Sequence, residues 1–152
     1  MSEPANWPTG KYGAILADPP WAFEVWSKDT GGGRSASSHY TTQEFGPLAE
    51  LPITNLAADD CALFCWVCWP SLLQAVEVIT AWGFLYKTCA FCWTKAKIKQ
   101  PDMFRDDADG QVGLGYWTRA NSEVCLLATR GHPKRLNADV RQAIIEPRRE
   151  HS

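Results

Sequence analysis

An apolar run over residues 12–17 ends at the four residues Asp18-Pro19-Pro20-Trp21. An uninterrupted apolar run of this length is typical of a strand buried inside a parallel sheet. The two prolines end that strand, because proline has no backbone N–H to continue the hydrogen-bond ladder. Open α/β sheets bind their ligands at the carboxyl ends of their strands. The pattern therefore predicts an α/β fold in which Asp18 occupies an active-site position.

The same four residues suit a substrate amine attached to a flat aromatic ring. Such an amine is a weak nucleophile, because its lone pair is delocalised into the ring, and it keeps two N–H donors. Asp18 is expected to accept one of them and the carbonyl of Pro19 the other, while Pro20 keeps the segment out of the sheet. Trp21 offers an indole face for the ring to stack on. This chemistry depends on positioning and needs neither a metal nor a covalent nucleophile.

Further motifs accompany this segment along most of the chain. They are Tyr40, residues 63–67, 82–84, 93–95 and 115–117, Glu123, Gly131, and residues 147–152. Together with Asp18-Pro19-Pro20-Trp21, they resemble the MT-A70 family of adenine-N6 methyltransferases. The resemblance implies transfer of a methyl group from S-adenosyl-L-methionine to the exocyclic N6 of adenine in nucleic acid. A prokaryotic style and a small single domain favour DNA over RNA as the substrate.

The resemblance also implies a fold and a set of site residues. The fold is a Rossmann-like methyltransferase sheet in permuted order, mostly parallel and with helices on both faces. Catalysis is assigned to Asp18, Pro19, Pro20 and Trp21, and cofactor binding to Ala17, Asp18 and Ser152. Substrate contacts are assigned to Tyr40, Trp66, Lys95, Trp117 and Glu123. The alternatives are a surface aromatic for Tyr40, a core position for Trp66 and a solvated strand end for Glu123.

Length and composition indicate one domain over residues 1–152 that stays in the cytoplasm. The chain is 45% hydrophobic and 21% charged, as is ordinary for a globular protein. No apolar stretch is long enough to span a membrane, and the N-terminus lacks a signal pattern. The net charge of −2 argues against binding nucleic acid by bulk electrostatics. The chain has two basic clusters. One contains Lys95, Lys97 and Lys99, and the other lies in residues 130–152. They could bind a phosphate backbone together only if both lay on the same edge of the molecule.

Six cysteines raise the question of a metal site. The pairs Cys65 and Cys68, and Cys89 and Cys92, have a spacing close to that of a zinc ribbon. Both pairs fall in strand-like runs, in which positions i and i+3 point to opposite faces. We therefore expect buried free thiols in a reducing compartment and no metal.

The remaining pattern alternates strands and helices. Strands are expected at residues 12–17, 61–69, 84–93, 123–129 and 143–146, and helices at 43–49 and from Pro70 to 82. Residues 23–38 and 98–115 are expected to be loops. This alternation favours a mostly parallel sheet.

The resemblance also makes the last part of the cofactor site an open question. Family members continue past the Glu150-His151-Ser152 region into a further strand that cradles the cofactor, so we expect the sheet to be incomplete at its C-terminus. The chain is then a fragment, a domain completed by another subunit or by self-association, or a degenerate fold. The last case gives the alternative function, a non-catalytic module that binds nucleic acid or a partner protein.

Overall fold

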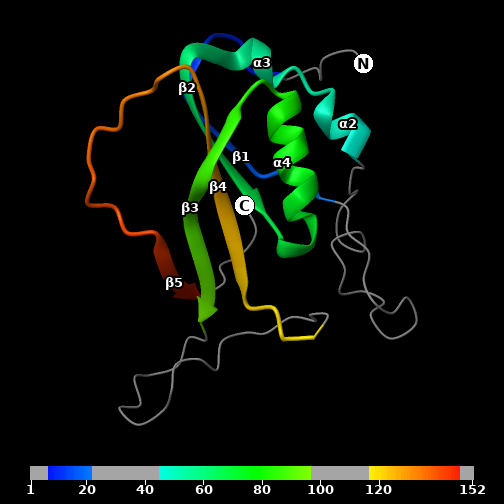
Figure 1. Cartoon of the computed structure of the whole chain (residues 1–152), viewed down its shortest axis with the longest axis vertical. Helices are drawn as coiled ribbons and strands as arrows, with labels where there is room; N and C mark the ends of the chain where they lie inside the picture. Colours follow the sequence, from blue (N-terminus) through cyan, green and yellow to red (C-terminus); the bar gives the residue numbers. More distant parts are fainter. Residues whose placement is uncertain (1–6, 22–44, 97–116, 148–152) are drawn as a thin grey trace.

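A computed structural model describes residues 7–21, 45–96 and 117–147 of the chain. Its elements, in chain order, are β1 (Tyr12–Ala17), α2 (Phe45–Ala49), α3 (Ile53–Leu56), β2 (Ala57–Val67), the 3-10 turn η1 (Trp69–Ser71), α4 (Leu72–Ala81), β3 (Leu85–Ala96), β4 (Ser122–Arg130) and β5 (Ala143–Pro147). The five expected strands and the helix that follows Pro70 are therefore present (Figure 1). None of the helices in these ranges is long and apolar enough to cross a membrane.

The strands form one sheet in the order β1-β2-β4-β3-β5. β1 is parallel to β2 and β5 is parallel to β3, whereas β4 is antiparallel to both of its neighbours. Four of the five strands consequently run in one direction, and β4 runs against them between β2 and β3. The α/β class expected of a Rossmann-like methyltransferase sheet is confirmed. The strand pairs, however, are evenly divided between parallel and antiparallel.

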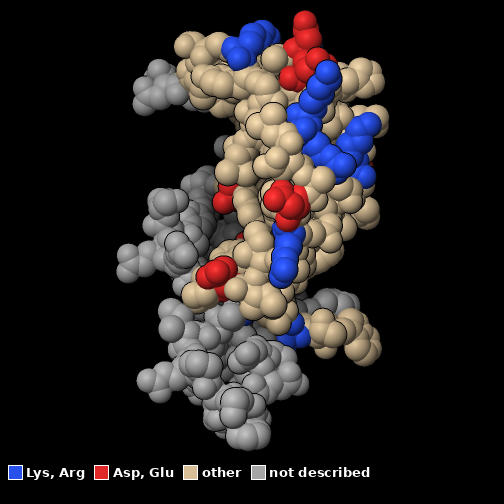
Figure 2. Space-filling model, turned by 90° about the vertical axis from the view of Figure 1, so that its left-hand side faces the viewer, with Lys and Arg blue, Asp and Glu red and all other residues tan. Residues whose placement is uncertain are grey.

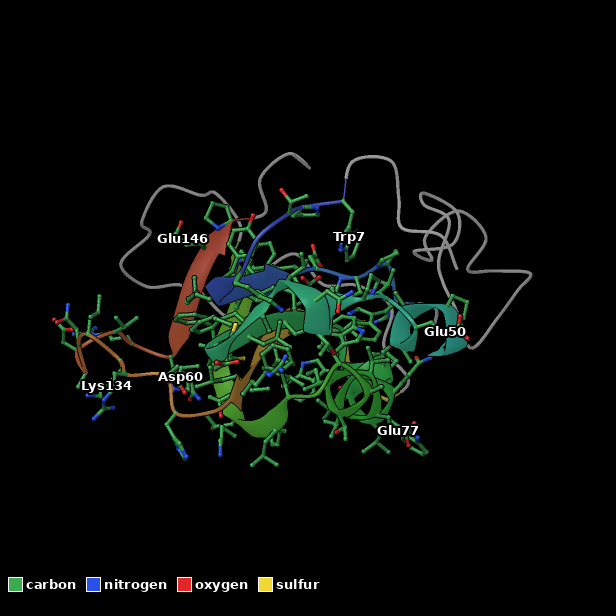
Figure 3. The ribbon with its side chains drawn as sticks, turned by 90° about the horizontal axis from the view of Figure 1, so that it is seen from above. Trp7, Glu50, Asp60, Glu77, Lys134 and Glu146 are labelled. Carbon is green, nitrogen blue, oxygen red and sulfur yellow. The ribbon has the colours of Figure 1, made fainter. Side chains whose placement is uncertain are left out.

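One face of the sheet, which we call the helix face, is covered by α4 and by the shorter helices. From Cys61 onward, alternate β2 residues lie on this face and are buried: Cys61, Leu63, Cys65 and Val67. They pack against apolar side chains of α4, namely Ala75, Val78 and Ile79. Figure 3 shows the outer side of this helix, where Glu77 points to solvent. Removal of these apolar surfaces from water stabilises the core.

The other face of the sheet, which we call the second face, carries larger and partly exposed side chains. Phe64 stacks on Phe91 with 6.2 Å between ring centroids, and Trp66 meets Trp93 edge to face at 6.5 Å. Helices were expected on both faces of the sheet. In residues 7–21, 45–96 and 117–147 the helices pack on the helix face.

A close contact at the end of β4 joins this strand to the start of β2. Gly131 follows β4 with a φ of 62°, a left-handed conformation that glycine adopts without strain. A Cβ atom there would lie 2.3 Å from the carbonyl oxygen of Asp59 and 2.3 Å from Oδ1 of Asp60. The next N–H, that of His132, donates to Oδ1 of Asp60 at 2.7 Å. We call this contact the glycine lock, and it joins the end of β4 to the start of β2.

Candidate active site

The segment Asp18-Pro19-Pro20-Trp21 lies at the carboxyl end of β1, as the sequence predicts. The expected burial of this strand is wrong, because β1 lies at the edge of the described sheet and most of its residues are exposed. The last residue of β1, Ala17, pairs with Cys65 of β2. Beyond it the chain makes a tight turn, in which the N–H of Trp21 donates to the carbonyl oxygen of Pro19 at 2.8 Å. The indole Nε1–H of Trp21 donates to the carbonyl oxygen of Trp66 at 2.8 Å. The first hydrogen bond closes the turn, and the second fixes it against the end of β2.

The environment of Trp21 differs from the one expected for a stacking surface. Its side chain is only 5% exposed and belongs to the buried core. The burial follows from the indole hydrogen bond, which directs the ring inward beneath the turn. In this conformation Trp21 holds the Asp-Pro-Pro turn in place and leaves little surface for an aromatic ring to stack on.

Asp18 is exposed at the edge of the site, and its negative charge contributes to the raised pKa of two buried thiols. Burial raises the pKa of Cys65 to about 12, with smaller contributions from Cys125 and from the Asp18 carboxylate. Burial likewise raises the pKa of Cys125 to about 11, and Cys89 and Asp18 add to it. The Asp18 carboxylate therefore adds to the raised pKa of one thiol on β2 and one on β4. Both thiols stay protonated at neutral pH.

A charged pair lies across the same end of the sheet. Lys95 of β3 donates from Nζ to Oε1 of Glu123, near the start of β4. The same ammonium group lies 5.3 Å from the ring centroid of Trp93. Trp93 and Glu123 are partners in the ladder between β3 and β4. The two residues predicted to contact substrate, Lys95 and Glu123, therefore bind each other.

The two predicted tryptophan contacts, Trp66 and Trp117, lie in different environments. Trp66 is partly buried on the second face, where it touches Trp93. Trp117 precedes β4 and is 89% exposed. Tyr40 and Ser152 fall outside the described residues. The structure thus joins Trp21 to the backbone of Trp66, while the Trp66 ring faces Trp93, and it places Lys95 and Glu123 on strands at the same end as Asp18.

The structure reveals one further residue at this end that the sequence analysis missed. Trp69 begins the turn η1 after β2, is 48% exposed, and donates from Nε1 to Oγ of Ser122 at 3.0 Å. The available signal was a tryptophan followed by Pro70 directly after a buried strand. Its partner lies 53 residues away, so local sequence did not indicate that this indole is held in place.

Two basic side chains of the described residues, one from each predicted cluster, lie at opposite ends of the sheet. Lys95 lies at the end of the sheet that carries Asp18, whereas Arg130 ends β4 at the opposite end and donates to the carbonyl of Thr54 at 3.1 Å. Figure 2 shows basic and acidic side chains interspersed over one side of the molecule. On this side, the described basic residues therefore do not form a continuous phosphate-binding surface.

The cysteines do not form a cluster with metal-binding geometry within the part of the chain that the structure describes. Cys65 lies on the helix face, whereas Cys125 pairs with Trp66 on the second face. All six thiols are free. A zinc site needs thiolates on one side of a turn, and these strands separate them.

Comparisons with known proteins agree with the resemblance found in the motifs. The pattern that defines the MT-A70 family matches residues 12–152. The chain is 36% identical to the Type II methyltransferase M.MunI of Mycoplasma sp over 102 residues, which cover 58% of this chain and 44% of that protein. It is 25% identical over 128 residues to the N(6)-adenosine-methyltransferase MT-A70-like protein of Drosophila melanogaster, covering 84% of this chain and 18% of that protein. The chain thus spans less than half the length of either relative.

Proposed function

Because the chain belongs to the MT-A70 family, we propose that it is the catalytic domain of an S-adenosyl-L-methionine-dependent methyltransferase acting on the N6 amino group of adenine in DNA. The observation that carries this proposal is the Asp-Pro-Pro turn, which the indole of Trp21 fixes at the carboxyl end of β1. The relative with the higher identity is named a Type II methyltransferase, and the other an N(6)-adenosine-methyltransferase.

The residues at the end of β1 suit a positively charged cofactor. Asp18 presents an exposed carboxylate, and the preceding Leu16 is 71% exposed on the strand at the edge of the described sheet. A carboxylate favours a nearby cation, and an apolar strand edge suits the adenosyl part. Ala17 and Asp18 would hold S-adenosyl-L-methionine, which supplies an electrophilic methyl group on a positively charged sulfur.

The chain's own groups would orient the substrate amine. The Asp18 carboxylate accepts one N–H of the adenine amine, and the second lone pair of the Pro19 carbonyl, beside the one used by Trp21, accepts the other. These acceptors aim the nitrogen lone pair at the methyl carbon. Bound cofactor would supply the methyl group to this nitrogen, and the exposed Asp18 carboxylate, which accepts an N–H of the amine, would take the released proton and pass it to water. Orientation supplies most of the acceleration.

In a duplex the target adenine must leave the base stack before it can reach this turn. Base flipping costs a few kcal/mol, and single-stranded or mismatched substrates avoid part of that cost. We therefore expect single-stranded DNA to be methylated at least as fast as duplex DNA of the same sequence.

The direct test incubates the protein with cofactor carrying an isotopically labelled methyl group and with matched DNA and RNA oligonucleotides. Digestion to nucleosides and mass spectrometry should then find N6-methyladenine, with more of it in DNA than in RNA. An oligonucleotide without adenine serves as the control. Binding of oligonucleotide without any methyl transfer would instead support the non-catalytic module, and label on another base would contradict the proposed substrate.

A further inference from the structure

Five of the seven tryptophans in the described residues lie at the end of the sheet that carries Asp18. They are Trp21, Trp66, Trp69, Trp93 and Trp117. Trp21 is buried, while Trp66 and Trp93 are partly buried against each other. Only Trp69 and Trp117 in this group present large exposed indoles.

Trp69 differs from Trp117 because it is both exposed and held. It follows directly on β2, and its Nε1–H is bonded to Oγ of Ser122 at the start of β4. Val67 pairs with Val124, so this hydrogen bond extends the contact between the two strands beyond the last ladder pair. An aromatic ring fixed on two strands loses little side-chain entropy when a ligand stacks on it.

The position of Trp69 relates it to the candidate active site. It lies three residues beyond Trp66, whose carbonyl holds Trp21 and hence the Asp-Pro-Pro turn. An extended chain advances about 3.3 Å per residue, so the two positions are separated by about 10 Å along the strand. This separation corresponds to roughly one or two nucleotides of an extended single strand.

From these observations we infer that Trp69 is a stacking platform for a nucleobase next to the target adenine. Aromatic side chains bind unstacked bases without strong sequence preference. The chain has a net charge of −2, and the described Lys95 and Arg130 lie at opposite ends of the sheet, so stacking would supply binding that charge does not. The inference rests on the proposed function and adds a residue that binds substrate outside the catalytic turn.

The test compares Trp69→Ala, Trp69→Phe and Ser122→Ala with the unmodified protein. Measurements are KM and kcat for methylation of single-stranded DNA, oligonucleotide affinity without cofactor by fluorescence anisotropy, and the thermal midpoint. Leu85→Ala is the control, because it truncates a side chain that is 64% exposed on β3, at the opposite end of the sheet. The control should leave KM and affinity unchanged.

A stacking role makes distinct predictions for the variants. Trp69→Ala should weaken affinity and raise KM about tenfold, with kcat within about twofold of the unmodified value. Trp69→Phe keeps a ring and should retain most of the affinity. Ser122→Ala removes the anchor and keeps the indole, so its effect should also be small. A merely structural role predicts that all three variants lower the thermal midpoint and affinity together, and this result would overturn the inference.

The measurements also separate this inference from the proposed function. If oligonucleotide binding depends on Trp69 but no methyl group is transferred, the proposed function fails and the platform stands. If methylation proceeds and Trp69→Ala changes neither KM nor affinity, only the platform is excluded. A protein that binds no oligonucleotide would also overturn it. So would a Trp69→Ala protein that has lost self-association, because Trp69 would then belong to an interface between two copies.

Discussion

At one end of the sheet, close contacts with the backbone join two strands, whereas the other end presents a group of functional side chains. The glycine lock joins the end of β4 to the start of β2 through a carbonyl, a carboxylate and an N–H, and it leaves no room for a Cβ at Gly131. The opposite end gathers Asp18, a charged pair and five indoles. The difference teaches that four strands running one way give the sheet a structural end and a chemical end. Substitutions at the two ends should therefore affect different measurements.

The largest effect is expected from Asp18→Asn at the chemical end. The substitution keeps the shape of the side chain but replaces an acceptor oxygen with a donor, so the adenine amine loses an acceptor and its orientation. Methyl transfer should fall by roughly two to three orders of magnitude, or about 3 to 4 kcal/mol. Asp59→Asn, at the structural end, is the matched control and should leave the rate unchanged. Unaltered transfer by Asp18→Asn would exclude the assigned role.

The next effect is expected from Gly131→Ala at the structural end. The added Cβ meets two oxygens at 2.3 Å on a backbone of φ 62°, so the lock must open. The free energy of unfolding should fall by about 3 kcal/mol, measured by denaturant titration. Gly46→Ala, where a Cβ meets nothing within 4 Å, is the control and should change stability little. Equal effects at the two glycines would show that the lock does not hold the sheet.

A smaller effect is expected from Trp21→Phe, which removes the hydrogen bond to the carbonyl of Trp66. Stability should fall by about 1 to 2 kcal/mol, because a partly buried carbonyl loses its partner. Methyl transfer should fall as well, because the turn that carries Asp18 is released.

The matched control for this substitution is Trp82→Phe. Its indole makes an equivalent bond of 2.8 Å to the carbonyl of Leu48, away from the chemical end. It should lose similar stability in a thermal unfolding experiment and keep its methylation rate per folded molecule. A parallel loss of activity in both variants would mean that Trp21 acts only through global stability.

The smallest effect concerns the pair Lys95 and Glu123. A double-mutant cycle with Lys95→Met and Glu123→Gln should give a coupling of about 0.2 to 1 kcal/mol, since both side chains are partly exposed. The coupling should decrease as salt is added. Lys87→Met, on an exposed β3 position, serves as the control and should not couple to Glu123. A coupling that salt does not weaken would indicate a desolvated pair.

Local sequence predicts the strands, α4 and the catalytic turn, because each depends on residues that are neighbours in the chain. The place of β4 could not be predicted in this way. Its pairing of Cys61 with Arg130 joins residues far apart in sequence, and alternation of strands and helices says nothing about a strand inserted later.

The same limit applies within the candidate site. The position of Asp18 follows from the strand before it, whereas the burial of Trp21 and the anchoring of Trp69 depend on partners 45 and 53 residues away. A single tryptophan in a sequence does not indicate whether its indole will lie inward beneath a turn or outward on the surface. Only the partner's carbonyl or hydroxyl determines this.

The insertion of β4 between β2 and β3 also affects the order in which the strands can pair during synthesis. During synthesis β2 and β3 are both made before β4. They cannot complete the sheet until residues 122–130 are available to pair between them. Pairings between distant segments form slowly, because the loop entropy is lost before the contacts are gained. β1 and β2 can pair early, but the central strand arrives late and meets both neighbours together. The two ends of β2, one bonded to Trp21 and the other part of the glycine lock, therefore become fixed only when the last third of the chain has been made.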